Sequence, residues 1–156
     1  MKYTGKGSNF LMWIPTSGNY VGIGQIMGVG SISQTGEEVD ATCIDEGTNF
    51  RDYLRGFSDT GECSLELAYD PAKSTHQEVI DVFTNGAERE CIIALGTVPP
   101  ASLRFDAFVR DMNWPELNPS DVMKLNPVLR CTSPISVSVA AFAKYGTAVY
   151  NTGVYA

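Results

Sequence analysis

The sequence predicts a mostly β (α+β) domain, an antiparallel β-sandwich or open barrel with one flanking α-helix. Short runs in which apolar and polar residues alternate recur along the chain, as at 63–69 and 103–110, and clusters of Gly and Pro separate them. Only residues 74–85 have the spacing of an amphipathic helix. The 156 residues are enough to bury a real core, so we expect one domain over 1–156.

The first part of the chain predicts a flexible arm and then apolar strands. Residues 1–9 are polar and rich in Gly, which is typical of a flexible N-terminal arm. The apolar run at 10–14 ends at Pro15 and predicts a strand. Residues 20–33 are apolar but contain four glycines, each of which costs about 1 kcal/mol in a helix, so a strand with bends is favoured.

Residues 39–71 hold the most informative feature. A strand-like segment at 39–44 leads into a long polar loop, 45–61, and the alternating strand at 63–69 follows. This loop carries aromatic and Arg side chains, and exposed apolar groups cost free energy unless something covers them. We therefore interpret the loop as an assembly surface. The candidate interface residues are Asp45, Phe50, Arg51, Tyr53, Leu54, Arg55, Phe57 and Asp59.

The predicted helix covers about residues 74–85. Ser74 or Thr75 can cap it, and Thr75 with Glu78 matches a capping box. Asn85-Gly86 supplies a left-handed stop. Its apolar face is formed by Val79, Ile80, Val82 and Phe83.

The second half of the chain predicts four more strands and a tail. Pro99-Pro100 and the Pro-containing segment 114–119 cannot join a strand ladder, so they are expected to be loops. Residues 144–156 are interpreted as a C-terminal arm or an edge strand. The strands are expected at 91–95, 103–110, 122–131 and 135–141.

The charge of the chain disfavours nucleic-acid binding. The formal net charge is −7, the pI is about 4.6, and no run of five basic residues occurs. An acidic surface is repelled by phosphate backbones, so we expect no affinity that depends on counterion release. The loop aromatics and arginines also fit a stacking platform for single strands, but the acidic chain favours a protein interface. No apolar run approaches the roughly 18 residues of a membrane span, and no secretory h-region is visible. We therefore expect a protein that stays in the cytoplasm or is exported by a route that needs no cleaved signal.

Residues that could carry chemistry show no catalytic pattern. The cysteines at 43, 63, 91 and 131 lack CxxC spacing, so we interpret them as reduced, buried thiols, with disulfides or a zinc site as alternatives. His76, the only histidine, fits a packed helix residue better than a catalytic base. The glycines at 22–28 do not have the spacing of a dinucleotide fingerprint. The candidate carboxylates show no convergence: Asp45, Glu46, Asp59, Glu62 and Asp70. We expect no enzyme activity, no cofactor and no metal.

The ordered set of local patterns resembles the tail tube proteins (major tail proteins) of long, non-contractile-tailed bacteriophages and their prophage relatives. The resemblance spans about residues 10–140. It is carried by Val39 to Asp45, Gly56 to Glu62, Ser64 to Leu67, Tyr69 to Pro71 and Phe83 to Gly86.

This resemblance implies a subunit that stacks as six-membered rings into a hollow tail tube. The N-terminal arm and the long loop would then become ordered at ring contacts, and DNA would pass through the lumen without specific binding. The implied partners are other copies of the chain, a tape measure protein, a tail terminator and tail-tip proteins. The implied location is the virion tail, assembled in the cytoplasm of the bacterial host.

Two other readings stay open. The first is a tail terminator or another tail ring protein of related fold. The second, from a different class, is a carbohydrate- or ligand-binding β-sandwich that uses Trp114, Tyr145 and Tyr150 as stacking residues.

Overall fold

The computed structural model describes residues 2–43, 47 and 51–139, and these form ten strands and one helix. The first five strands are β1 (Asn9–Ile14), β2 (Asn19–Gly22), β3 (Ile26–Val29), β4 (Gln34–Asp40) and β5 (Tyr53–Thr60). After them come β6 (Glu62–Ala68), α1 (Ser74–Asn85), β7 (Glu88–Leu95), β8 (Ala101–Asn113), β9 (Lys124–Cys131) and β10 (Ser136–Val139).

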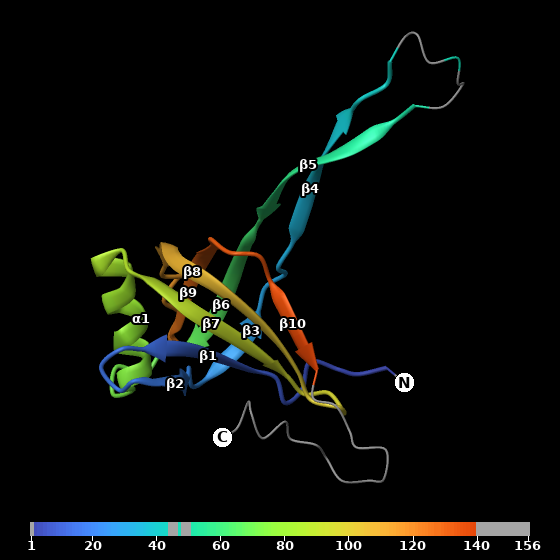
Figure 1. Cartoon of the computed structure of the whole chain (residues 1–156). Coiled ribbons are helices and arrows are strands. Elements are labelled where there is room, and N and C mark those ends of the chain that lie inside the picture. The colour runs from blue at the N-terminus through green and yellow to red at the C-terminus, as the bar shows by residue number, and fades with distance from the viewer. Residues whose placement is uncertain (1, 44–46, 48–50, 140–156) are drawn as a thin grey trace, which may run out of the picture.

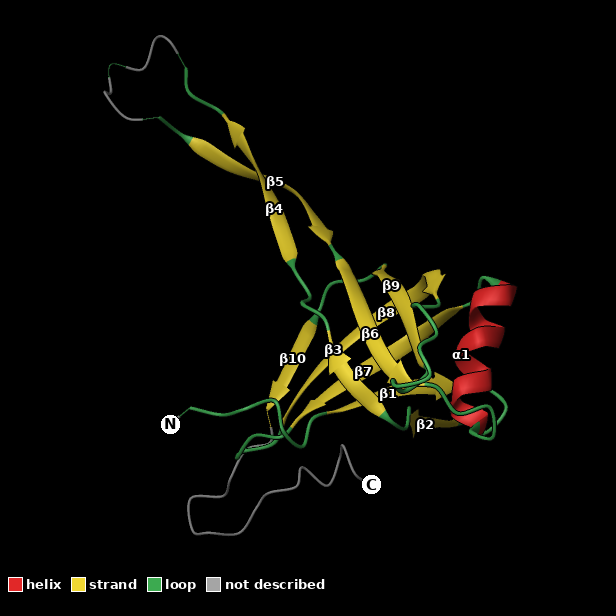
Figure 2. Ribbon diagram, turned by 180° about the vertical axis from the view of Figure 1, so that it is seen from behind, coloured by secondary structure: helices red, strands yellow, loops and turns green. Residues whose placement is uncertain are grey.

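Eight of the strands form one antiparallel sheet, and two form a separate hairpin. The sheet has the order β2-β1-β7-β8-β9-β6-β3, and β10 pairs with the first residues of β8. This sheet makes the body of the molecule, with α1 along one side (Figure 1). The β4–β5 hairpin projects away from the body as a long arm (Figures 1 and 2). The predicted mostly β fold with one flanking helix is confirmed.

The alternating runs of the sequence become the two faces of the sheet. In β6, Cys63, Leu65 and Leu67 are buried, whereas Ser64 between them is exposed. The apolar faces of the strands and α1 meet in one core, which removes their apolar area from water. Its largest fully buried side chains include Phe10, Met12, Leu65, Leu67, Phe105, Leu125 and Leu129.

The helix has the predicted extent but not the predicted cap. Lys73 occupies the N-cap position and no side chain caps the first turn, so the capping box with Thr75 is wrong. The helix starts two residues too early for Thr75 to be its cap. At the other end, Gly86 has φ 62°, and its N–H and that of Ala87 donate to carbonyls of the last turn. The predicted Gly stop is therefore confirmed.

His76 attaches α1 to two other parts of the body. Its ring is fully buried, and Nδ1 accepts a hydrogen bond from the backbone N–H of Asp70 at 3.1 Å. Nε2 therefore carries the proton and donates to the carbonyl oxygen of Gly24 at 2.8 Å. These bonds join the helix to the end of β6 and to the β2–β3 turn. The predicted role of His76 as a packed helix residue is confirmed.

Several predicted segments differ from the structure. Residues 20–33 form two strands rather than one, because the chain turns at Gln25, where φ is 57°. The strand predicted at 39–44 lies at 34–40. The predicted tail strand or arm at 144–156 lies outside the described residues. Among the described residues, no helix has the length and apolar character that a membrane crossing requires.

Candidate assembly surface

The structure places the predicted interface residues on the hairpin arm, which we define as residues 34–60. The prediction of a loop over 45–61 is wrong for Tyr53–Thr60, which form β5 and pair with β4. The backbone N–H and C=O groups of this segment pair with those of β4, and the loop prediction did not take this pairing into account. Tyr53, Leu54, Arg55, Phe57 and Asp59 lie on β5, Arg51 precedes it, and Asp45 and Phe50 lie outside the described residues.

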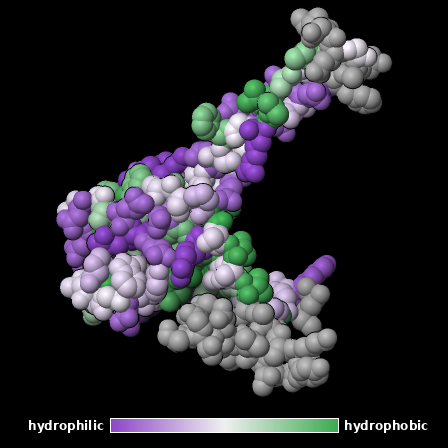
Figure 3. Space-filling view, in the orientation of Figure 1, coloured by the Kyte–Doolittle hydropathy of each residue, from purple (hydrophilic) through white to green (hydrophobic). Residues whose placement is uncertain are grey.

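The arm has no core of its own. Every residue of β4 is exposed, and in β5 only Gly56 and Thr60 are partly buried. The side chains of Tyr53, Leu54 and Phe57 are 55%, 62% and 89% exposed. Figure 3 shows apolar side chains along the projecting arm. A two-stranded hairpin without a packed face is marginally stable in water, so this surface requires a partner to be fully stabilised.

The root of the arm is fixed to the body by polar contacts. Arg130 donates two hydrogen bonds to the carboxylate of Asp59, at 2.9 and 3.0 Å. The hydroxyl of Thr60 donates to the carbonyl of Ser133 at 3.1 Å, and the N–H of Gly61 donates to the carbonyl of Ser33 at 2.7 Å. Asp59, one of the predicted interface residues, therefore sets the direction of the arm at its root.

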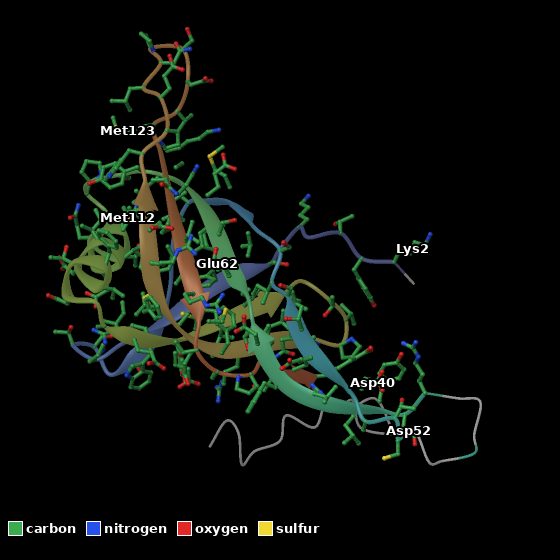
Figure 4. All side chains as sticks on the ribbon, turned by 90° about the horizontal axis from the view of Figure 1, so that it is seen from above. Lys2, Asp40, Asp52, Glu62, Met112 and Met123 are labelled. Carbon is green, nitrogen blue, oxygen red and sulfur yellow. The ribbon has the colours of Figure 1, made fainter. Side chains whose placement is uncertain are left out.

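A small network fixes the described end of the arm. The N–H of Ala41 donates to the carbonyl of Asp52, and the N–H of Asp52 donates to the hydroxyl of Thr42 at 3.0 Å. The hydroxyl and N–H of Thr42 both donate to Asp40, which lowers the pKa of that carboxyl. Asp40 and Asp52 lie near the end of the arm, far from Met112 and Met123 (Figure 4).

Most of the net negative charge of the protein lies in the arm. Residues 34–60 contain seven carboxylates and two arginines, so they account for five of the seven net negative charges. The acidic strand β4, with Glu37, Glu38 and exposed Val39, was not part of the predicted interface. Only Thr35 and Val39 in β4 favour a strand, so local propensity gives no clear signal for it.

The carboxylates considered for catalysis have structural partners. Asp59 binds Arg130, Glu62 binds Arg110, and the carboxylate of Asp70 accepts from the N–H of Ala72 at 2.9 Å. Asp45 and Glu46 lie outside the described residues. In the described part of the chain, no three His, Cys, Asp or Glu side chains are grouped so that they could hold a metal ion.

The thiols are free, but only three of them are buried. Cys63, Cys91 and Cys131 lie in the core, whereas Cys43 is exposed on the arm, so its predicted burial is wrong. Cys43 follows β4 and lies beyond the reach of the core. Burial raises the pKa of Cys63 to about 12 and raises the pKa values of Cys91 and Cys131.

The aromatic residues of the carbohydrate reading are not brought together. Trp114 packs edge-on against Tyr69, with ring centroids 5.0 Å apart. Tyr145 and Tyr150 lie outside the described residues. Of the three residues of this reading, the described structure therefore places only Trp114, which leaves the reading without a described sugar platform.

Solved structures share the fold at low sequence identity. The tail of an empty GTA particle, from helical refinement with C6 symmetry, has a TM-score of 0.70 and 15% identity over 88% of this chain and 99% of that one. The tail tube of SPP1 has a TM-score of 0.70 and 12% identity over 88% and 80% of the two chains. The sheath/tube terminator of the extracellular contractile injection system PVC has a TM-score of 0.67 and 12% identity over 88% and 97%.

Comparison with known sequences identifies a family for the chain but no individual relative. No curated protein sequence matches the chain. The family model described as "Lambda phage tail tube protein, TTP" matches residues 1–110, which is more than half of the chain. That span includes β1 to β7 and most of β8, with the complete arm. The chain therefore belongs to the lambda phage tail tube protein family and is a structural protein of a phage tail.

Proposed function

We propose that this protein polymerises as stacked six-membered rings into the tail tube, and that DNA passes through the lumen of the tube during ejection. The observation that carries the proposal is the hairpin arm, which is joined to the body only at its root among the described residues and exposes Tyr53, Leu54 and Phe57. Membership of the tail tube family and the C6 symmetry of the similar GTA tail support it.

The arm fits an assembly in which each contact joins two different surfaces. It leaves the body where β5 continues into β6, at the opposite end from the N-terminal segment (Figure 1). A projecting arm that meets a different patch of the next subunit makes a heterologous contact, which repeats from copy to copy. Such contacts close into rings where the rotation closes and extend into a tube where rings stack.

The charge of the chain fits a conduit rather than a DNA-binding protein. At physiological salt, repulsion between like charges acts over about 8 Å. A net charge of −7 per subunit therefore disfavours adhesion of DNA to the protein. The paired arginines strengthen this effect, because Arg104, Arg110 and Arg130 are engaged by Glu90, Glu62 and Asp59.

The same role defines the partners and the location. We expect the tube to contact a tape measure protein in its lumen, a terminator at one end and tail-tip proteins at the other, and to assemble in the cytoplasm of the bacterial host. The similarity to the PVC terminator keeps a second candidate, a terminator that forms one ring and stops.

Electron microscopy of the concentrated, purified protein tests the proposal. Tubes of uniform diameter with sixfold end views are the expected result. Isolated closed rings would favour the terminator, and a subunit that stays monomeric at millimolar concentration would contradict both. Sedimentation velocity over a dilution series provides the matching solution measurement, since a polymer shows a critical concentration and a closed ring does not.

A further inference from the structure

We propose that the arm of one subunit inserts Phe57 into an apolar groove of a second copy, and that lysines at the rim of this groove bind the acidic arm. This inference rests on the proposed function and names the surface that receives the arm.

The groove lies between β3 and the ends of β7 and β8 that are remote from the arm. Its volume is about 520 Å³. Met27 in its apolar lining is more than half exposed, and the lining consists of Ile26, Met27, Val29, Ile32, Ile93, Leu95 and Leu103. The register of β10 places Val137 opposite Leu103, so two further exposed side chains, Val137 and Val139, lie on the strand beside it. The arm of the same subunit projects away from this groove (Figure 1), so it leaves the groove open to another copy.

The N-terminal segment forms the rim of the groove. Gly5 and Ser8 line it, so Lys6 lies at its edge. The segment is held against Gly96, where a Cβ atom would lie only 2.5 Å from the carbonyl oxygen of Lys6. The N–H of Gly96 also donates to the hydroxyl of Ser8 at 3.3 Å. The rim therefore has a defined position, fixed by a glycine that leaves room for the chain to pass.

The charges of the two surfaces are complementary. Residues 1–9 contain Lys2 and Lys6 and no carboxylate, whereas the arm carries a net charge of −5. Neither lysine forms an ion pair within the described residues, although most basic side chains of the body do. Complementary charge of this kind directs two surfaces together and sets their register.

The positions of the two surfaces require a second copy. The arm projects from one end of the body and the N-terminal segment lies at the other, while β3 and β10 run between the root of the arm and that segment (Figures 1 and 2). Asp40 and Asp52 on the arm and Lys2 also lie on the same side of the body, away from α1 (Figure 4). A subunit placed beyond the end of the arm, in the same orientation, thus presents its groove and its lysines to the arm. The contact is head-to-tail, so it repeats along a stack.

A cysteine cross-link between two different variants tests the contact. Both variants carry Cys43→Ser, which removes the exposed thiol; one also carries Phe57→Cys and the other Met27→Cys. The variants are mixed in reducing buffer, assembled, and then oxidised. Because each subunit has one exposed cysteine, a disulfide-linked dimer that appears only in the mixture joins two copies. The matched control replaces Met27→Cys by Phe83→Cys, on the exposed surface of α1.

Each outcome of the experiment decides a different point. Tubes with a cross-linked dimer in the 57/27 mixture, and little in the 57/83 mixture, support the groove. Tubes without that dimer overturn the proposed contact at the groove and leave the proposed function intact. If the Met27→Cys variant instead forms a cross-link with a Tyr150→Cys variant, the groove binds the C-terminal segment and the proposed contact is overturned as well. A wild-type protein that forms no tubes contradicts the proposed function itself.

A charge exchange checks the rim separately. Lys2→Glu with Lys6→Glu should raise the critical concentration at least tenfold at low salt. Adding Glu37→Lys and Glu38→Lys on the arm should restore at least part of that loss. Unchanged assembly of the lysine variant would overturn the role of the rim.

Discussion

Replacing Phe57 by Ala should separate assembly from folding. The side chain is 89% exposed in the isolated subunit, so its removal leaves no cavity in the core. Substitutions at such surface positions change the free energy of unfolding by about 0.5 kcal/mol or less. In the assembled tube, however, the aromatic ring of Phe57 is buried in the proposed contact, so its removal weakens assembly.

The size of the effect follows from the area that the contact removes from water. Full burial of a Phe side chain contributes about 1.5–3 kcal/mol. Since every 1.4 kcal/mol is a factor of ten in an equilibrium constant, the critical concentration for assembly should rise about 10- to 150-fold. Each subunit contributes one arm, so this factor applies to the addition of each subunit.

The assay compares wild type, Phe57→Ala and the control Phe83→Ala. The critical concentration is measured as the unpolymerised protein that remains after high-speed centrifugation, and urea unfolding of the dilute subunit gives stability. Phe83 is 41% exposed on α1, away from both proposed surfaces, so its substitution should leave the critical concentration unchanged. Equal critical concentrations for Phe57→Ala and wild type would refute the reasoning, as would a large loss of subunit stability.

Three further predictions concern the arm, the helix and the core. Replacing residues 37–57 by Asn-Gly, a two-residue hairpin turn, should abolish tubes in electron micrographs while the circular dichroism spectrum stays that of a folded β protein. His76→Ala should lower the free energy of unfolding in urea by about 2–5 kcal/mol, because two buried backbone groups lose their partners, whereas Asp81→Ala on the exposed helix face should change it little. Burial raises the pKa of the Cys63 thiol to about 12, whereas an unfolded thiol ionises near pH 8.5. The protonated thiol therefore contributes fully to the free energy of unfolding below pH 8.5, and this contribution is lost as the pH rises toward 12. Cys63→Ala should therefore make the fall of stability between pH 9 and 11 shallower by about 1.4 kcal/mol per pH unit, and Cys43→Ala should not.

The core strands could be predicted because their alternation of apolar and polar residues follows from burial of one strand face. The alternation of Cys63, Leu65 and Leu67 with polar residues follows directly from burial of one face, and the structure buries those three side chains. The same holds for Phe105, Ala107 and Val109 in β8. Gly86 could be predicted because a left-handed helix stop favours glycine whatever the tertiary fold.

The arm could not be predicted in form, because neither of its faces is buried. Without burial, β4 and β5 show no contrast between apolar and polar positions, and their aromatic and charged residues suggested a loop. Composition still identified the exposed apolar side chains of Tyr53, Leu54 and Phe57 as an unusual feature. The groove could not be predicted, since Ile26, Leu95 and Leu103 come from three strands that only the sheet topology brings together.

The separation of core and arm explains how one chain can fold alone and still polymerise. The body buries one continuous core, so folding does not depend on the arm, which adds exposed strands and most of the net charge. Repulsion between arms of free subunits opposes random association at low salt, because each carries a net charge of −5. The basic rim is at the opposite end of the body, so only the head-to-tail orientation brings unlike charges together.

Raising the salt concentration should therefore weaken both the repulsion between arms and the attraction between the arm and the basic rim. We expect faster non-specific aggregation and slower tube growth at 1 M than at 0.1 M salt, measured by light scattering together with electron microscopy. Tube growth that is equally fast at both salt concentrations would mean that the apolar contact of Phe57 sets the orientation without help from charge.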